Sequence, residues 1–459
     1  MLPEDIMDNS GKNREHWRSR GGFILAAAGS AIGLGNIWRF PYMTGEHGGA
    51  AFILIYLIAV VLLGYPLLIN EMILGRKAQR DPVGVFKRLA PHSPWWLTGA
   101  LAVFTGFFIL SYYAVVAGWS LAYIYKVVIA VVSPGMDHAL AFKDHISSVA
   151  EPIAWQGLFM ALTIGIIAAG VVKGIQRWAT ILMPVLFVLL LILIVRSVTL
   201  PGAAEGLIYY LKPDFGKVTG RTVLAALSQA FFSLSLGMGA ILTYGSYMQK
   251  KDEITGSAAW VAGLDTGVAL LAGFALFPAI FALGFEPGAG PGLAFITLPA
   301  VFAQMPLGGL FGVLFFFLLS IAALTSAISL LEVVTAWLID EKGWTRRRAA
   351  AGVGVVIFIV GIPASLGYSL LKDFSFPGLG TDLLDTYDWI SNSIFLPVGA
   401  LLTAVFTGYV WGGARAGREI ATGRSASKIA QFWVWQIRYL VPILIAMVMV
   451  VGLYGTFVK

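Results

Sequence analysis

The sequence predicts an all-α polytopic membrane protein with eleven transmembrane helices. Hydrophobic residues make up 58% of the 459 residues and charged residues only 12%, whereas a soluble domain carries about 25% charged residues. Apolar segments of membrane-spanning length recur along the whole chain. Two of these segments are interrupted by glycines at matching positions, which indicates that the helices serve a purpose beyond crossing the bilayer.

Eleven apolar segments are close to or longer than the roughly 20 residues that cross a bilayer. They cover residues 21–46, 50–75, 97–131, 153–172, 177–199, 222–247, 257–284, 308–339, 349–370, 387–412 and 429–456. Between the seventh and eighth segments lies GPGLAFITLPAVFAQMPLGG (290–309), which is too short and too broken to span. We expect it to form a hairpin of short helices over one face of the protein.

The distribution of lysine and arginine predicts the orientation in the membrane. The segments on the N-terminal side hold 21 of these residues and the opposite segments hold eight. Because cytoplasmic loops carry the excess of positive charge, we expect a cytoplasmic N-terminus and an external C-terminus in a multi-pass protein of the cell's inner (plasma) membrane. The first 20 residues are polar, so no signal peptide is expected.

Composition also argues against several function classes. The chain has no cysteine, so disulfides and thiolate metal sites are not expected. Its five histidines are scattered and no catalytic dyad is evident, so we do not expect an enzyme. The net charge of +7 is explained by cytoplasmic loops, and no nucleic-acid partner is expected.

The two interrupted segments suggest an internal repeat. GSAIGLGN (29–36) in the first span and SLSLGMGA (233–240) in the sixth both place a Gly-x-Gly triplet in mid-span. The two spans lie five apart along the chain. Because five is an odd number, the second copy of a five-span unit enters the membrane inverted. The alternative is that the glycines serve only close helix packing. We expect a cytoplasmic N-terminal segment at 1–20, repeats at 21–199 and 222–412, and an additional helix at 429–456.

A helix break inside lipid frees backbone groups that need partners. Amides at a half-helix N-terminus suit a carboxylate, and carbonyls at a half-helix C-terminus suit a small cation. A ligand that carries a carboxylate, bound together with Na⁺, satisfies both. Two acidic residues lie inside predicted spans and are functional candidates. We expect Glu71 to accept bonds from amides freed in the sixth span, and Glu332 to join a polar network.

The motifs GSAIGLGNIWRFPY (29–42), AFFSLSLGMGAILTYGSY (230–247) and LTSAIS (324–329) resemble those of the neurotransmitter:sodium symporter family. The resemblance covers nearly the whole chain. It implies a 5+5 inverted repeat in which helices 1 and 6 are unwound at the midplane. It also implies sodium-coupled symport by alternating access. The rival hypothesis is a membrane amino acid sensor that does not transport, although no signalling domain is evident.

The resemblance implies two sodium sites. The first would use Ala31, Asn36, Ser233 and Asp265, completed by the carboxylate of the substrate. The second would use Gly29, Ile32, Ala322, Thr325 and Ser326. All the proposed ligand atoms are oxygens, which hard cations prefer. Taken alone, Thr325 and Ser326 are as well explained by hydroxyls that bond a carbonyl one turn back.

Asp265 stands where asparagine is common in the family. Chloride-dependent relatives hold chloride beside the first sodium, and here Tyr56, Gln229 and Ser233 match that neighbourhood while Ala269 replaces a hydroxyl or acid. We therefore expect Asp265 to supply the negative charge, and no chloride to be required.

The resemblance also implies a substrate site and two gates. The substrate would contact Ser30, Ala31, Leu34, Gly35, Ile109, Tyr113, Phe232, Ser235, Met238, Ser326, Ser329 and Leu330. This lining is mostly apolar and holds no acid or base, so we expect neutral hydrophobic L-amino acids, both aliphatic and aromatic. Arg39 and Asp388 would pair as the outer gate. Arg14, Trp17, Tyr247 and Asp340 would form the inner gate. The preferred amino acid, the stoichiometry and the oligomeric state are not predicted.

Overall fold

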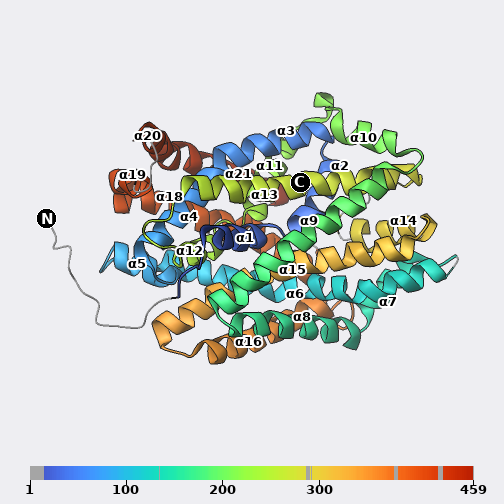
Figure 1. Ribbon diagram of the computed structural model, residues 1–459, viewed down its shortest axis with the longest axis horizontal. Helices are drawn as coiled ribbons and strands as arrows, with labels where there is room; N and C mark the ends of the chain where they lie inside the picture. The colour runs from blue at the N-terminus through green and yellow to red at the C-terminus, as the bar shows by residue number, and fades with distance from the viewer. Residues whose placement is uncertain are drawn as a thin grey trace.

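The computed structural model describes residues 15–133, 135–285, 290, 292–376, 381–421 and 427–457. Within these ranges the chain is almost entirely helical, and no strand forms beyond one isolated bridge between Gly49 and Pro213. Most of the long helices run in roughly the same direction and form one bundle (Figure 1). The all-α prediction is therefore confirmed.

The first half of the chain contains one span bent at a break, one continuous span that includes a π-helical turn, and three further long helices. Its elements are α1 (Arg20–Ala31), the π-helical turn η1 (Gly35–Arg39), α2 (Phe40–Glu46), α3 (Ala50–Ala59), η2 (Val60–Gly64), α4 (Tyr65–Ala78), α5 (Pro82–Leu89), α6 (Trp96–Val132), α7 (His138–Ser147), α8 (Ala150–Ala168), η3 (Val171–Gln176) and α9 (Arg177–Val198).

The second half repeats the pattern of a broken span followed by long helices. Its elements are α10 (Ala203–Leu211), η4 (Phe215–Lys217), α11 (Gly220–Ser233), α12 (Ala240–Gly245), α13 (Thr255–Ala282), η5 (Leu293–Thr297), α14 (Leu298–Gln304), α15 (Gly308–Lys342), α16 (Arg346–Leu366), α17 (Leu383–Ile390), η6 (Ser391–Phe395), α18 (Leu396–Val405), η7 (Phe406–Gly412), α19 (Gly413–Ala421), α20 (Ser427–Trp435), η8 (Gln436–Leu440) and α21 (Val441–Phe457).

In the described part of the chain, nine helices are long and apolar enough to cross a membrane. A tenth span forms when α1 and the helix from η1 to α2 are counted together, because these two helices are bent by 55° at a short break. The predicted sixth span is split into α11 and α12, of 14 and six residues, and neither crosses a bilayer alone. The structure thus agrees with the predicted spans, with breaks in the two that carry the Gly-x-Gly triplets.

The segment between α13 and α15 differs from its prediction. Its described residues form one short apolar helix, Leu293–Gln304, rather than a hairpin of two. Pro299 is the second residue of α14, a position where a helix tolerates the missing amide proton of proline. η5 therefore runs directly into α14 without a turn.

Local sequence signals set several helix bounds. Ser19 caps α1 by accepting the Gly22 amide, and Thr219 and Thr222 form a reciprocal capping pair at the start of α11. Gly343, with φ of +67°, ends α15 in the left-handed conformation that glycine adopts without strain.

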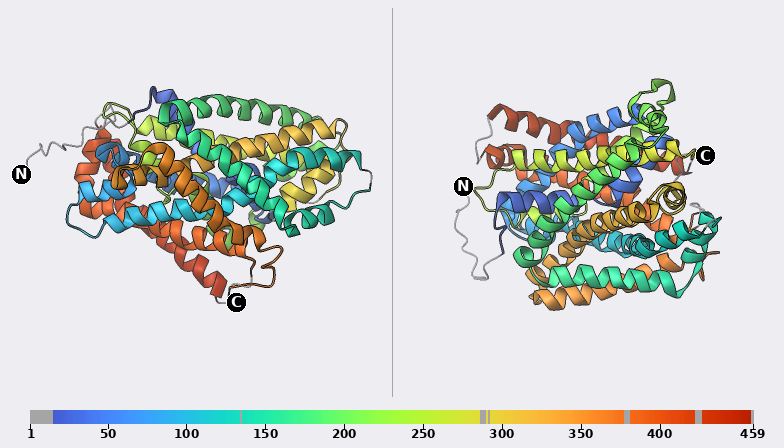
Figure 2. Two further views of the ribbon diagram at one scale, coloured as in Figure 1. Left: turned by 90° about the horizontal axis from the view of Figure 1, so that it is seen from below. Right: turned by 45° about the vertical axis from the view of Figure 1, so that its right-hand side comes forward.

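The long helices α6 and α15 pack against each other through the middle of the bundle, and α1 contacts α9, α13 and α15. In the left view of Figure 2, which shows the molecule from below, the C-terminal helix α21 lies at the edge of the bundle. Large apolar side chains such as Ile58, Val61 and Val195 are exposed on the outside, as expected for a surface in contact with lipid. The short helices α1 and α12 are surrounded by protein, so their broken ends lie in the interior.

Candidate functional site

The first break lies between α1 and η1. Ile32 has extended backbone angles, so the helix stops there. Of the amides that this frees, that of Gly33 donates to Asn36 Oδ1 at 3.1 Å and that of Leu34 donates to the Tyr113 hydroxyl at 3.3 Å. The freed backbone groups therefore meet neutral polar side chains.

Glycine is needed at this break for space rather than for backbone angles. A Cβ atom on Gly33 would lie 2.5 Å from the Ser326 hydroxyl, and one on Gly35 would lie 2.9 Å from the Phe232 ring. Both distances are shorter than a real Cβ contact. The two glycines thus let the backbone of the first span approach α15 and α11 closely.

The second break separates α11 from α12 and has different chemistry. Ser235, Gly237 and Gly239 all have positive φ, at 53°, 79° and 76°, a conformation that glycine adopts at little cost. Glu71 on α4 accepts the amide of Gly237 at 2.7 Å and that of Leu242 at 3.2 Å. The prediction that Glu71 partners amides freed at this break is confirmed.

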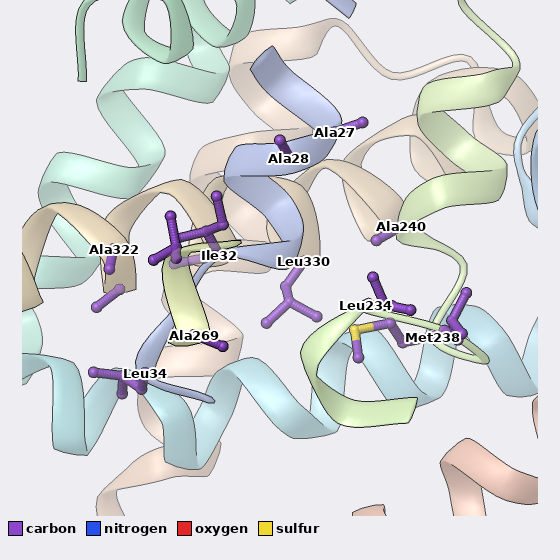
Figure 3. Packing of buried hydrophobic residues seen from close by; sticks show 14 of the residues in the cluster. Ala27, Ala28, Ile32, Leu34, Leu234, Met238, Ala240, Ala269, Ala322 and Leu330 are labelled. Carbon is purple, nitrogen blue, oxygen red and sulfur yellow. The ribbon is translucent and has the colours of Figure 1, made fainter. Parts of the chain in front are cut away.

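A cavity lies between the two breaks. Its lining residues are Ser30, Ala31, Gly33, Leu34, Gly35, Ile109, Tyr113, Phe232, Ser235, Met238, Ser326 and Leu330. In Figure 3 the labelled Leu330 lies between the segment of Ile32 and that of Leu234 and Met238. The structure therefore brings together eleven of the twelve residues that the sequence proposes for a substrate site.

Ser329 is the predicted residue that does not line the cavity. It is buried behind Ser30, whose hydroxyl donates to it at 2.6 Å, and its own hydroxyl donates one turn back to the Ser326 carbonyl at 2.8 Å. Gly33 was missed as a lining residue, although its place inside the Gly-x-Gly triplet was a signal for it. Ser329 instead supports the wall formed by Ser30.

Three of the four residues predicted for the first sodium site form one buried cluster: Asn36, Ser233 and Asp265. Asn36 Nδ2 donates to Asp265 Oδ1 at 2.7 Å and to the Ser233 hydroxyl at 3.0 Å. The Ser233 hydroxyl donates to Asp265 Oδ2 at 2.8 Å. Both oxygens of the fully buried Asp265 carboxylate thus have partners. Ala31, the fourth predicted residue, lines the cavity.

The predicted residues of the second sodium site also gather, at the end of α1. The Thr325 hydroxyl lies 3.0 Å from the Ala322 carbonyl and 3.4 Å from that of Ile32, and the Ser326 hydroxyl lies 3.3 Å from the Ile32 carbonyl. Thr325 also donates one turn back, to Ile321 at 3.2 Å, which is the ordinary arrangement in a helix.

Gly29 closes this oxygen cluster on one side. A Cβ atom there would contact the Thr325 side chain at 3.4 Å and the sulfur of Met183 at 3.2 Å. Helix α9 therefore supplies an apolar wall beside the cluster. Within the described residues, no three His, Cys, Asp or Glu side chains gather as a metal site.

The predicted chloride neighbourhood is only partly assembled. The Tyr56 hydroxyl lies 3.4 Å from the Ser233 hydroxyl, but the Gln229 side chain is directed elsewhere: its Nε2 donates to the Gly35 carbonyl at 3.0 Å. Ala269 is fully buried and offers no polar side-chain atom. The carboxylate that contacts Ser233 here is that of Asp265.

The expected direct pair of the outer gate is absent. Arg39 Nη1 donates to Gln229 Oε1 at 3.0 Å, and its guanidinium lies 4.9 Å from the centre of the Phe232 ring. Asp388 instead accepts the Tyr112 hydroxyl at 3.2 Å. The predicted Arg39–Asp388 ion pair is therefore wrong for this structure, because Arg39 is hydrogen-bonded to Gln229 and Asp388 to Tyr112.

At the opposite end of the bundle, Trp17 is buried against the residues at the end of α12. It is 2% exposed; its backbone amide donates to the Tyr247 carbonyl at 3.1 Å and its indole Nε1 donates to the Tyr244 carbonyl at 2.9 Å. Asp340 Oδ2 accepts the Asp81 amide at 2.8 Å. Arg14, the remaining predicted gate residue, lies outside the described residues.

Glu332 forms the network that was expected of it. It accepts the Tyr247 hydroxyl at 2.5 Å and Arg346 Nη1 at 2.7 Å, and Arg346 Nε lies 3.7 Å from Glu15. The sequence reading missed Arg346, which looked like one of several loop charges. It also did not single out Asp81 as a neighbour of Asp340. The pKa of Asp81 is raised to about 7 by burial and by the nearby Asp340 and Glu341 carboxylates.

Comparisons with known proteins find similarity along nearly the whole chain. The model of the sodium:neurotransmitter symporter family matches residues 14–134 and 135–457. YhdH of Bacillus subtilis, an uncharacterized sodium-dependent transporter, is 42% identical over 436 residues that cover 94% of this chain and 96% of that protein. The human sodium- and chloride-dependent taurine transporter is 28% identical, over 78% of this chain and 67% of that transporter.

The fold is also similar to a solved structure, the crystal structure of MhsT in complex with L-phenylalanine. The two chains are 46% identical and superimpose with a TM-score of 0.89, over 96% of this chain and 100% of that chain.

Proposed function

This chain belongs to the sodium:neurotransmitter symporter family, and from that premise we propose that it carries neutral hydrophobic L-amino acids into the cell together with Na⁺. The observation that supports this most is the cavity between two broken helices, flanked by two clusters of oxygen atoms. An amino acid carboxylate suits the amides of the first break, and Na⁺ suits the oxygens.

The repeat organisation is part of the proposal. We assign residues 21–199 and 222–412 to the two inverted units and 429–456 to an additional helix, with both breaks at the unit interface. The N-terminus would be cytoplasmic, in the plasma membrane. Trp17 and its partners then close the inner path, while Arg39 and Asp388 border the outer path.

The cavity lining favours a neutral side chain on the substrate. Ile109, Phe232, Met238 and Leu330 contribute apolar surface, and none of the twelve lining residues is charged. A charged substrate side chain buried there would lack a partner and would cost several kcal/mol. Met238 is unbranched and adapts to ligands of different shape, which suits both aliphatic and aromatic substrates. MhsT, crystallised with L-phenylalanine, is consistent with this substrate class.

Coupling follows if the substrate carboxylate completes the first oxygen cluster. Ala31, Asn36, Ser233 and Asp265 would then hold one Na⁺, and each ligand would raise the affinity for the other by the same factor. A second Na⁺ would be held by Gly29, Ile32, Ala322, Thr325 and Ser326. The membrane potential adds about 2.3 kcal/mol for each charge moved across 100 mV.

Uptake into proteoliposomes tests the proposal. We expect labelled L-leucine, L-phenylalanine and L-tryptophan to accumulate under an inward Na⁺ gradient but not when K⁺ replaces Na⁺, and L-lysine to be excluded. Preloaded unlabelled substrate should drive counterflow of labelled substrate. Binding without counterflow would identify a sensor and would contradict the proposal.

Chloride independence is tested in the same vesicles. Because Asp265 already places a carboxylate beside the first oxygen cluster, replacing chloride with gluconate should leave the rate of uptake unchanged. Loss of uptake in gluconate would show that an external anion is needed in addition to Asp265.

A further inference from the structure

The hydroxyl groups in the lining of the central cavity decide which polar atoms a bound molecule meets there. Four lining residues carry a hydroxyl: Ser30, Tyr113, Ser235 and Ser326. Tyr113 accepts the amide of Leu34 at the first break, at 3.3 Å, and so belongs to the end of the cavity that suits a carboxylate. The three serines are therefore the hydroxyls that could serve a polar group on the substrate side chain.

Each of the three serines already donates its proton to another atom of the protein. The Ser235 and Ser326 hydroxyls both donate to the Ser30 carbonyl, at 2.9 Å and 3.0 Å. The Ser30 hydroxyl donates to the Ser329 hydroxyl at 2.6 Å. Because a serine hydroxyl has a single proton, none of the three has one left for a molecule in the cavity.

Ser329 fixes the direction of the Ser30 hydroxyl from behind the cavity wall. The two buried serines face each other from α1 and α15. Ser329 donates its own proton one turn back along its helix, to the Ser326 carbonyl at 2.8 Å. Its oxygen therefore acts only as an acceptor toward Ser30, and the donors run in one direction, from Ser30 through Ser329 to the backbone of α15. Ser329 does not line the cavity, yet it determines what Ser30 presents there.

We propose that Ser329 is a specificity-determining residue, because it takes the Ser30 proton and leaves the serines of the lining without a donor for the substrate side chain. The inference rests on the proposed amino acid site. A substrate with a hydroxyl or carboxamide side chain buries an oxygen that finds no serine donor, and such an oxygen is costly. L-Valine is therefore preferred to L-threonine, which has nearly the same shape, and L-leucine is preferred to L-asparagine.

Displacement of labelled L-leucine from the purified protein in Na⁺ measures this preference. Wild type should bind valine at least tenfold more tightly than threonine, and leucine at least tenfold more tightly than asparagine. The two proposals fail in different ways in this assay. Absence of Na⁺-dependent leucine binding would contradict the proposed function. Normal leucine binding with equal displacement by valine and threonine would contradict only the role of Ser329.

Ser329→Ala should change the selectivity, because it releases the Ser30 proton into the cavity. The affinity for threonine should rise about three- to tenfold, the range expected for one hydrogen bond, while that for valine stays within twofold. The double variant Ser30→Ala/Ser329→Ala removes the released hydroxyl and should lose this gain. Ser320→Ala is the matched control: this buried serine on the same helix lies 3.0 Å from the Ser120 hydroxyl and is not in the cavity lining. Its selectivity should equal that of wild type.

Three outcomes overturn the role of Ser329. An equal change for threonine and valine in Ser329→Ala would mean that the variant only opens a void. An unchanged ratio would mean that the released hydroxyl bonds to its own helix, and an undiminished gain in the double variant would exclude Ser30 as the donor. If Ser329→Ala does not fold, Ser329→Cys replaces it, because a thiol is a weak acceptor. It should shift the ratio in the same direction by a smaller factor, and an unchanged ratio there contradicts the proposal equally.

Discussion

The two helix breaks look alike in sequence but are stabilised by different chemistry. At the first break, neutral groups on Asn36 and Tyr113 take the freed amides, at 3.1 and 3.3 Å. At the second, the Glu71 carboxylate takes two amides, the shorter bond measuring 2.7 Å. Bonds to a charged acceptor are shorter and stronger than neutral ones. A carboxylate of the protein therefore holds the second break, while the first is held by contacts to neutral side chains, which a ligand can replace.

This difference assigns the breaks different tasks. The Ile32 carbonyl at the first break lies 3.3 Å and 3.4 Å from two hydroxyls, near the outer limit for hydrogen bonds. A cation that displaces such contacts loses little. A ligand at the second break competes with a buried carboxylate. We therefore expect loss of the Glu71 carboxylate at the second break to affect folding, and loss of polar partners at the first break to affect ligand affinity.

Loss of the Glu71 carboxylate should have the largest effect. In Glu71→Ala two buried amides lose their acceptor, at about 1–3 kcal/mol each, so the melting temperature in detergent should fall sharply and uptake should be lost. Glu71→Gln keeps one acceptor oxygen and should lie between Glu71→Ala and the wild type. A melting curve for Glu71→Ala that coincides with that of the wild type would remove the contrast between the breaks.

Asp265→Asn should have the next largest effect, and it should act on sodium rather than on stability. The change removes the negative charge from the cluster that Asn36 and Ser233 share. The Na⁺ concentration for half-maximal uptake should rise at least tenfold, which corresponds to about 1.4 kcal/mol. Asp214→Asn, an exposed acid before η4, is the control and should behave as wild type. Equal Na⁺ dependence in the two variants would argue against the first sodium site.

Thr325→Val should raise the half-saturating Na⁺ concentration by about 3- to 30-fold, equivalent to about 0.7–2 kcal/mol, and should leave the melting temperature within a few degrees of wild type. The change removes one hydroxyl beside the Ile32 carbonyl while its volume is preserved. Thr335→Val on the same helix is a matched control, since that buried hydroxyl has no partner among the described residues. An identical response of both variants would mean that the first break does not hold a cation.

Met238→Ala should have the smallest effect. It shortens a cavity-lining side chain at the second break without touching Glu71 or its amides. Competition assays should show a loss of about 2- to 10-fold in affinity for large substrates relative to L-alanine, at unchanged Na⁺ dependence. Met160→Leu, a buried methionine in α8 that is not in the cavity lining, is the control. A change in Na⁺ dependence instead would link the two breaks more closely than we expect.

The spans and the two breaks could be predicted because they follow from local composition. Apolar runs give the helices, and glycines at 237 and 239 fit the positive φ that the second break needs. The partner of Asp388 could not be predicted in this way. Arg39, Gln229 and Tyr112 have long side chains from three helices, and which of them meet depends on rotamers that no sequence pattern encodes.

Long-range partners explain the other misses. Arg346 stands in a run of arginines that orientation alone accounts for, yet it reaches the buried Glu332. Ser329 has the spacing of a lining residue, but its hydroxyl is taken by Ser30 and by its own helix. In the segment around α14, the described residues continue as one helix because its proline falls where a helix tolerates it.

Gln229 joins the entrance of the protein to its first break. Its side-chain oxygen accepts from Arg39, while its nitrogen donates to the Gly35 carbonyl. If Arg39 turned toward Asp388, the Gln229 Oε1 atom would lose its donor. The side chain would then be less fixed, and its hydrogen bond to the Gly35 carbonyl would weaken. The Gln229 side chain thus connects the position of Arg39 to the backbone of the first break at Gly35.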